Sequence, residues 1–147
     1  MRSLAFVIVG LIALPVWAAD SALPEDTGLI RPADDSDLSE FLWKNRPVVL
    51  FADTPDDPRI QQQISALERD ETVMLDRDVV VLTDTDPAAR SALRTRYRPR
   101  GFQLLLVGKD GGVKLRKPFP QTVRELSRYI DKMPLREQEI RDRRGSD

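Results

Sequence analysis

The sequence predicts an α/β domain with a four-stranded mixed sheet, strand order 2-1-3-4, covered by helices on both faces. Residues 48–51 and 79–82 are short, wholly apolar runs, which is typical of strands buried on both sides. A helical pattern lies between them, and a parallel pair of strands needs such a crossover. Residues 109–112 contain Asp-Gly, which favours a tight hairpin between two further strands. A right-handed crossover then gives the stated strand order.

Helix-start signals flank the first strand. Asp37 and Glu40 have the spacing of a capping box, which predicts a helix from residue 37 that Pro47 ends. After the strand, Asp57 followed by Pro58 has the order of an N-cap and a first helical residue. A second helix is therefore expected to begin at Pro58 and to connect the two parallel strands.

The second half of the domain contains further helix-start signals and strand patterns. The Asp-Pro pair at residues 86–87 predicts a helix that runs through residue 97. Residues 102–107 and 113–117 are predicted as the two hairpin strands. Thr-x-x-Glu at residues 122–125 is a further capping box, and the helix that it opens is expected to turn Met133 toward the core.

The two ends of the chain differ from the domain in composition. Arg2 precedes an apolar run that ends in the small-x-small site Val16-Trp17-Ala18, which predicts an export signal and a mature chain from Ala19. An uncleaved anchor is the alternative, although the run is shorter than the ~20 residues that span a bilayer. The predicted segments are a signal peptide (1–18), a flexible acidic leader (19–35), the folded domain (36–134) and a charged, partly helical C-terminal tail (135–147).

The composition excludes several classes of chemistry. The 147 residues include no Cys and no His. Disulfides, thiol redox chemistry, His-dependent triads and ordinary zinc sites are thereby excluded. Without Arg2 the chain has 22 basic and 24 acidic residues and no basic stripe, so a nucleic-acid partner is not expected. We expect no cofactor and no metal, a periplasmic or secreted location, and membrane contact only through an uncleaved signal.

The order of the elements resembles that of the thioredoxin fold. Residues 50–53 resemble the end of the thioredoxin strand that leads into the active site, and residues 97–106 resemble the segment entering its third core strand. Where that family has its CxxC motif, this chain has residues 54–58, Thr-Pro-Asp-Asp-Pro, and Gln103 stands at its cis-proline position. Thiol–disulfide exchange needs a thiolate, so the chain by itself cannot catalyse it.

Five segments of the chain carry a closer resemblance: residues 46–52 (RPVVLFA), 57–59 (DPR), 76–81 (DRDVVV), 106–114 (LVGKDGGVK) and 130–136 (IDKMPLR). In this order they are similar to the P-DUDES family, exported thioredoxin-like domains without an assigned activity. Leu135 departs from the family pattern, which has Met there. The resemblance implies a fold and a compartment, periplasmic or extracellular, rather than a reaction.

The first candidate site is a cleft at the sheet edge where thioredoxin-like proteins hold substrates. Acidic side chains after the first strand are expected to face arginines of neighbouring segments and to recognise a polar ligand or peptide. A solvated ion-pair network, with Asp57 as a helix cap, is the structural alternative. The candidate residues are Asp53, Asp56, Asp57, Arg59, Arg98, Arg100, Gln103 and Arg116.

The second candidate is the surface where the hairpin turn meets the end of the last helix. Asp131 or Glu139 is expected to pair with Lys109 or Lys114 and to lock the helix to the hairpin. The glycine-rich turn could instead bind an anion through its N–H groups, or the surface could dock a partner. The candidate residues are Lys109, Asp110, Gly111, Gly112, Lys114, Asp131, Met133 and Arg136.

Two functions remain open from the sequence. The first is a non-redox exported domain that binds a protein or another component of the cell envelope. The alternative is an enzyme that uses the carboxylate and arginine cleft.

Overall fold

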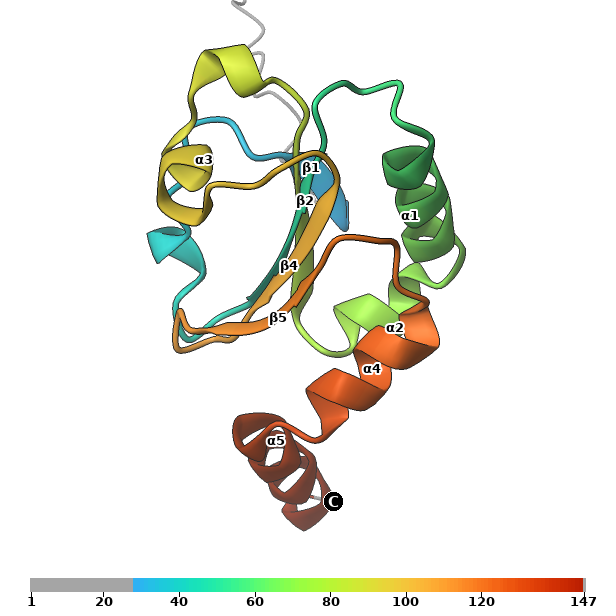
Figure 1. Ribbon diagram of the computed structural model, residues 1–147. Coiled ribbons are helices and arrows are strands. Elements are labelled where there is room, and N and C mark those ends of the chain that lie inside the picture. Colours follow the sequence, from blue (N-terminus) through green and yellow to red (C-terminus); the bar gives the residue numbers. More distant parts are fainter. Residues whose placement is uncertain (1–27, 147) are drawn as a thin grey trace, which may run out of the picture.

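The computed structural model describes residues 28–146, which form a mixed five-stranded sheet between two groups of helices (Figure 1). The strand order is β1-β3-β2-β4-β5. β2 pairs in parallel with β3 and antiparallel with β4, and β5 forms a hairpin with β4. These four strands have the predicted order 2-1-3-4. The strands are β1 (Ile30–Pro32), β2 (Arg46–Phe51), β3 (Val79–Asp84), β4 (Gln103–Val107) and β5 (Val113–Lys117).

The fifth strand lies in the segment predicted to be a flexible leader. β1 runs parallel to β3, and the backbone N–H of Ala33 donates to Thr83 (N···O 2.9 Å) just beyond their pairing. Leu29 and Ala33, on either side of β1, are both buried. The prediction of four strands is therefore wrong at this edge. Three residues are too few to show a strand pattern, and β1 depends on its partner strand for its hydrogen bonds.

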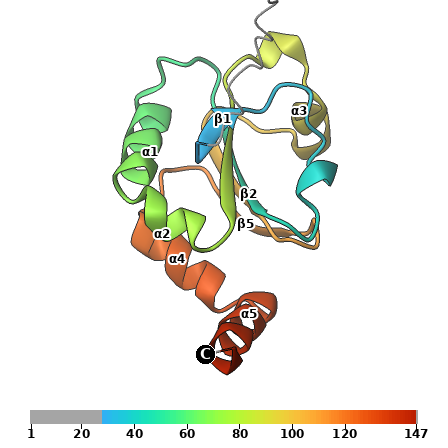
Figure 2. The same cartoon turned by 180° about the vertical axis from the view of Figure 1, so that it is seen from behind.

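Helices cover both faces of the sheet (Figures 1 and 2). α1, α2 and α4 lie over one face, η1 and α3 lie over the other, and α5 lies beyond one end of the sheet. None of the helices between residues 28 and 146 has the length and apolar content needed to span a membrane. The helices are η1 (Ser39–Phe41), α1 (Pro58–Arg69), α2 (Glu71–Leu75), η2 (Pro87–Ala89), α3 (Ala92–Tyr97), α4 (Val123–Asp131) and α5 (Pro134–Gly145).

The sheet separates two hydrophobic clusters. Val48 and Leu50 of β2 belong to the cluster beneath α1, α2 and α4, whereas Val49 and Phe51 belong to the cluster beneath η1 and α3. All four side chains are fully buried. Successive strand residues point to opposite faces. The part of β2 that is covered on both sides by these clusters, residues 48–51, is therefore apolar throughout, as predicted.

Two of the predicted helix starts form as expected. The Asp57 carboxylate accepts from the backbone N–H of Arg59 (2.9 Å) at the start of α1. Thr122 and Glu125 form the complete capping box of α4.

Two other predicted helices are shorter than expected. The helix predicted from residue 37 is only the single turn η1, because Asp37 accepts from the N–H and the hydroxyl of Ser39 (2.9 and 2.6 Å) and Leu38 adopts a left-handed φ of 72°. The helix predicted over residues 86–97 is divided into η2 and α3. Arg90 ends η2 in the left-handed region, and the Ser91 hydroxyl then caps α3.

Candidate functional site

The acidic residues of the predicted cleft lie on the loop between β2 and α1. Asp53 and Asp56 are exposed. Asp57 accepts two hydrogen bonds from the Arg59 guanidinium, at 3.0 Å from Nε and 2.7 Å from Nη2. These bonds from Arg59 hold the pKa of the Asp57 carboxyl below its usual range. Asp57 and Arg59 therefore satisfy each other at the start of α1.

The basic residues of the predicted cleft have other partners. Arg116 Nη1 donates to the carbonyl of Tyr97 (2.9 Å) and to Oε1 of Gln103 (3.4 Å). Arg98 and Arg100 are exposed on the loop that precedes β4. Within residues 28–146, no ion pair joins these three arginines to the acidic residues of the loop between β2 and α1. The two sets share one edge of the sheet without the predicted pairing.

A buried network of residues that were not predicted as site residues lies at the same edge. The Arg94 guanidinium contacts Oδ1 of Asp84 (2.7 Å) and donates to the carbonyl of Ala52 (2.7 Å), and the Ser91 hydroxyl donates to the other Asp84 oxygen (2.5 Å). Both charged side chains are less than a tenth exposed. The network joins the ends of β2 and β3 to α3, so its role is structural.

At the opposite end of the sheet, α5 is locked to the body by Glu139. Its carboxylate lies 2.8 Å from Nζ of Lys109 and 3.0 Å from Nη2 of Arg46. The pairing of Lys109 with Glu139 is one of those predicted from the sequence. Asp131 instead binds Arg77 through both carboxylate oxygens (2.9 and 2.8 Å).

The pKa of Glu139 shows that Arg46 and Lys109 stabilise its charged form. Burial raises the pKa of Glu139, but hydrogen bonds from Arg46 and Lys109 outweigh burial and lower the pKa from 4.5 to about 2. Arg46 is only 1% exposed, so its charge has little access to solvent. Glu139 is thus the counter-charge of a buried arginine.

Two arginines of α5 extend the lock to Asp76, which follows α2. Nη2 of Arg136 lies 2.9 Å from Asp76, and Nη1 of Arg143 lies 3.0 Å from it. Hydrogen bonds from Arg143 and Arg136 lower the pKa of Asp76. Arg136 is the only buried residue of α5, so ion pairs rather than apolar packing hold this helix in place.

A largely apolar groove lies between the hairpin, the start of α5 and the loop before β2. Its volume is about 290 Å³. Met133 is half-buried at its base, and Trp43 and Leu135 are exposed at its rim (68% and 37%). The lining residues are Trp43, Arg46, Gly108, Lys109, Asp110, Lys114, Met133, Pro134 and Leu135.

Trp43 is held in an unfavourable backbone conformation. Its φ is 62°, a region that bulky residues rarely adopt. Its N–H donates to the carbonyl of Lys109 (2.8 Å), and the N–H of Lys44 donates to Phe41 (3.0 Å). Trp43 is not among the candidate residues predicted from the sequence. The available signal was that Trp43 and Trp17, which lies in the predicted signal peptide, are the two tryptophans of the chain.

The hairpin turn beside the groove satisfies its own N–H groups. The N–H of Gly108 donates to Gly112 (2.8 Å), that of Gly111 to Gly108 (3.0 Å) and that of Gly112 to Oδ1 of Asp110 (3.0 Å). Lys114 Nζ donates to the second oxygen of Asp110 (2.9 Å). Because these donors are engaged, the geometry supports a tight hairpin rather than an anion site.

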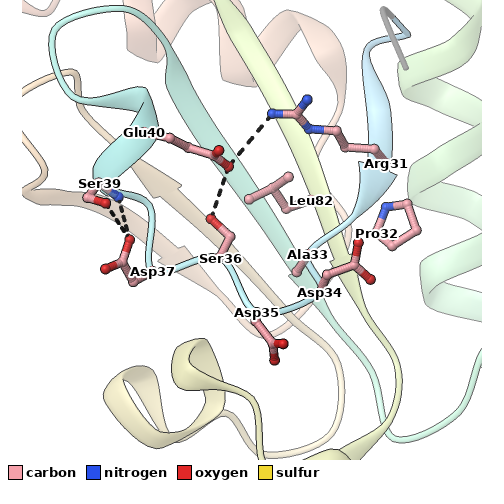
Figure 3. A pocket seen from close by; sticks show the side chains of 10 residues that line it. All are labelled: Arg31, Pro32, Ala33, Asp34, Asp35, Ser36, Asp37, Ser39, Glu40 and Leu82. Carbon is pink, nitrogen blue, oxygen red and sulfur yellow. Dashed lines mark hydrogen bonds and ion pairs between the residues drawn. The ribbon is translucent and has the colours of Figure 1, made fainter. Parts of the chain in front are cut away.

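An acidic hollow of about 610 Å³ lies beside β1 and η1 (Figure 3). Its carboxylates turn toward different partners. Asp37 accepts from Ser39, while Glu40 accepts from the Ser36 hydroxyl (3.3 Å) and lies 3.9 Å from Arg31. In residues 28–146 no group of three or more acidic side chains is arranged to hold a metal ion. The hollow has no feature of a binding site beyond its acidity.

Comparison with known proteins assigns the family. The model of a family described as a domain of unknown function (DUF4174) matches residues 37–139, and the chain belongs to this family. The matched region contains every residue that lines the groove and ends at Glu139, whereas β1 lies outside it.

Solved structures that resemble this one include two peroxiredoxins. The reduced 2-Cys peroxiredoxin of Plasmodium vivax has 15% sequence identity and a TM-score of 0.57, with 69% of this chain and 84% of that chain covered. Prx1a of Plasmodium yoelii has 18% identity and a TM-score of 0.53, with 69% and 80% covered. At these identities the likeness shows the fold alone, which is α/β and thioredoxin-like.

Proposed function

We propose that this protein is a non-redox binding domain that acts in the cell envelope after export, and that the groove beside Trp43 binds an apolar side chain of a partner protein. The observation that carries the proposal is an exposed tryptophan held with positive φ at the rim of an apolar groove. Such backbone strain costs of order 1–3 kcal/mol and concentrates at functional sites. Tryptophan is also enriched among the residues that dominate protein interfaces.

The size and charge of the groove indicate the chemistry of the partner. A volume of about 290 Å³ is at the lower limit of cavities that hold small molecules, so the groove suits one or two side chains of a protein segment. The ion-pair network that borders the groove through Arg46 and Lys109 has one more cation than carboxylates, which favours a segment with a carboxylate beside its apolar anchor. The network consists of Arg46, Arg77, Lys109, Arg136 and Arg143 with Asp76, Asp78, Asp131 and Glu139.

Export, location and the finer family assignment are part of this proposal. The signal peptide over residues 1–18, a mature chain from Ala19 and a periplasmic or extracellular location rest on the sequence pattern of the N-terminus. Membership of P-DUDES rests on the motifs quoted above. The absence of Cys supports the non-redox part, since thiol–disulfide exchange needs a thiolate.

The alternative, an enzyme that uses the carboxylate and arginine cleft, has less support. Asp57 is engaged by Arg59, and Arg116 is engaged by Tyr97 and Gln103. A catalytic pair would need these side chains to leave their present partners before meeting a substrate.

Site-specific photo-crosslinking tests the proposal. A benzophenone amino acid replaces Trp43 in the full chain, which is expressed in its native envelope and irradiated. The matched control carries the same group at Leu75, an exposed apolar residue (44%) on α2 that does not line the groove. We expect a discrete adduct with one envelope protein from position 43 and none from position 75.

A second variant shows whether the groove itself binds the partner. Leu135→Asp introduces a charge at the exposed groove rim and is expected to abolish the position-43 adduct without changing the urea midpoint of the domain. Equal adducts from positions 43 and 75, or an adduct that survives Leu135→Asp, would show that the groove does not bind a specific partner.

A further inference from the structure

A group of cations that form no ion pair in the described part of the chain lies at the end of the sheet opposite the groove. Arg98 and Arg100 are on the loop before β4, and Arg116 and Lys117 are at the end of β5. Arg116 reaches the carbonyl of Tyr97 (2.9 Å), and Lys117 is the pairing partner of Leu104 near the start of β4. The two segments are therefore neighbours. Among the ion pairs of residues 28–146, none involves any of these four cations.

An exposed phenylalanine stands beside these cations on a fixed loop. Phe119 lies between two prolines and is 55% exposed, and Nζ of Lys117 lies 5.8 Å from the centre of its ring. The loop is fixed by Gln63, which is fully buried in α1: it accepts from the N–H of Gln121 (2.7 Å) and donates to the carbonyl of Gln121 (2.9 Å). The flanking prolines and the hydrogen bonds between Gln63 and Gln121 therefore hold the loop in a conformation that exposes the Phe119 ring.

We propose that this edge is a docking surface for an anionic phospholipid membrane. The edge consists of Arg98, Arg100, Arg116, Lys117 and Phe119. Its four cations outnumber Asp53 and Asp56, the two exposed carboxylates of the β2–α1 loop at the same end of the sheet. Cations beside an anionic bilayer are attracted to its surface, and an apolar ring at the same level enters the headgroup boundary. None of the cavities described above includes these residues. A membrane surface needs no cavity, and the features of this edge are cations and an outward aromatic ring.

A purely structural interpretation accounts for some of the cations at this edge. Basic residues on an edge strand such as β5 discourage pairing with the edges of other sheets. That interpretation explains Arg116 and Lys117. It does not explain two further arginines on the loop before β4, or a rigid loop that exposes an aromatic ring.

The proposed surface is compatible with the groove and separate from it. β5 runs from the hairpin turn, which borders the groove, to Lys117 at the other end. A domain docked through Phe119 would therefore leave the groove on the side away from the membrane, open to a protein partner.

Vesicle flotation of the chain from Ala19 to Asp147 tests this inference. The probes are vesicles of phosphatidylcholine with and without phosphatidylglycerol, at low and high salt. We expect binding that requires phosphatidylglycerol and weakens with salt. Arg100→Glu combined with Lys117→Glu should weaken binding by at least about 25-fold, since each cation contributes about fivefold. Phe119→Ser should weaken binding that remains at high salt.

The matched control is Arg90→Glu combined with Lys132→Glu, which makes the same change in net charge at exposed cations outside the edge. It should leave binding within about twofold of the unmodified chain. Equal loss in the two double variants, unchanged binding of Phe119→Ser, or no binding to phosphatidylglycerol would overturn the proposal. Binding to polyglutamate without binding to vesicles would assign the edge to an acidic protein instead.

Two further measurements keep the result interpretable. Urea midpoints check that each variant is folded, and Arg100→Glu alone, on an exposed loop, replaces the double variant if that one is unfolded. Trp43→Ala should float like the unmodified chain, so failure at the groove and failure at this edge are distinguishable.

Discussion

Replacing Glu139 with glutamine removes the charge at which α5, β2 and the hairpin meet, while it preserves the size of the side chain. The carboxylate is the counter-charge of Arg46, which is 1% exposed, and of Lys109. After the substitution Arg46 keeps its hydrogen bond to the carbonyl of Arg77 (3.0 Å) but has no anion beside it. Uncompensated burial of a charge is strongly destabilising, so the folded state should lose stability.

The magnitude follows from the pKa of Glu139. A fall from 4.5 to about 2 corresponds to roughly 3 kcal/mol of stabilisation at neutral pH. The side chain is 19% exposed, and solvent screens part of this interaction. We expect Glu139→Gln to lower the free energy of unfolding by about 2 kcal/mol at pH 7.

The lowered pKa of Glu139 also determines how its contribution to stability changes with pH. Because the folded chain binds this proton more weakly than the unfolded chain, the contribution of Glu139 is complete above about pH 5 and falls between pH 4.5 and pH 2. At pH 3 roughly 40% of it remains. Glutamine does not titrate, so the difference in stability between the two proteins should narrow as the pH falls.

Urea unfolding at pH 7, 4 and 3, followed by the fluorescence of Trp43, measures this difference. Glu137→Gln is the control, because Glu137 is an exposed acid on the same helix without an ion pair in the described structure. A difference that is the same at pH 7 and pH 3, or a control that loses as much as Glu139→Gln, would refute the assignment of Glu139 as the lock.

Four further outcomes are expected. Gly111→Ala should lower the free energy of unfolding by about 1 kcal/mol or more, since φ is 81° and a Cβ would lie 3.0 Å from Leu42; an unchanged urea midpoint would contradict this. A chain that begins at residue 36 should be less stable by about 2 kcal/mol than one that begins at residue 28, because the burial of Leu29 is lost; equal midpoints would make β1 dispensable. The protein should not reduce insulin disulfides, and dithiothreitol should not change its urea midpoint, since it has no thiol; reduction above a no-protein control would contradict this. The intact mass of the exported protein should correspond to a chain from Ala19, and a mass that includes residues 1–18 would indicate an anchor.

The features that the sequence predicted correctly depend on short stretches of chain. The wholly apolar runs in β2 and β3 report burial on both faces, and Asp-Gly selects the hairpin turn. Where two local interactions compete, the prediction was wrong. Asp37 has the spacing of a capping box, but the nearby Ser39 takes its carboxylate and the helix is reduced to one turn.

The candidate site was predictable only as far as topology determines it. After β5 the chain runs back through α4 toward the end of the sheet that carries the hairpin turn, which is sufficient to predict a partner for Lys109. Arg46 is 93 residues from Glu139 in the chain, and no local pattern pairs them. The left-handed backbone of Trp43 depends on a hydrogen bond from its N–H to the hairpin, which the sequence does not reveal.

The way α5 is held connects the stability of the domain to its proposed function. Pro134 and Leu135 form one wall of the groove, and they lie on the same helix as Arg136 and Glu139. Because apolar packing contributes little to this helix, loss of its ion pairs would displace the wall while the sheet and Trp43 remain in place. A variant at Glu139 should therefore weaken partner binding without changing any residue that touches the partner, whereas Leu135→Asp should weaken binding without changing the pH dependence of unfolding. The two variants therefore distinguish two causes of weaker partner binding: displacement of the helix that forms one wall of the groove, in the Glu139 variant, and loss of apolar surface at the groove rim, in Leu135→Asp.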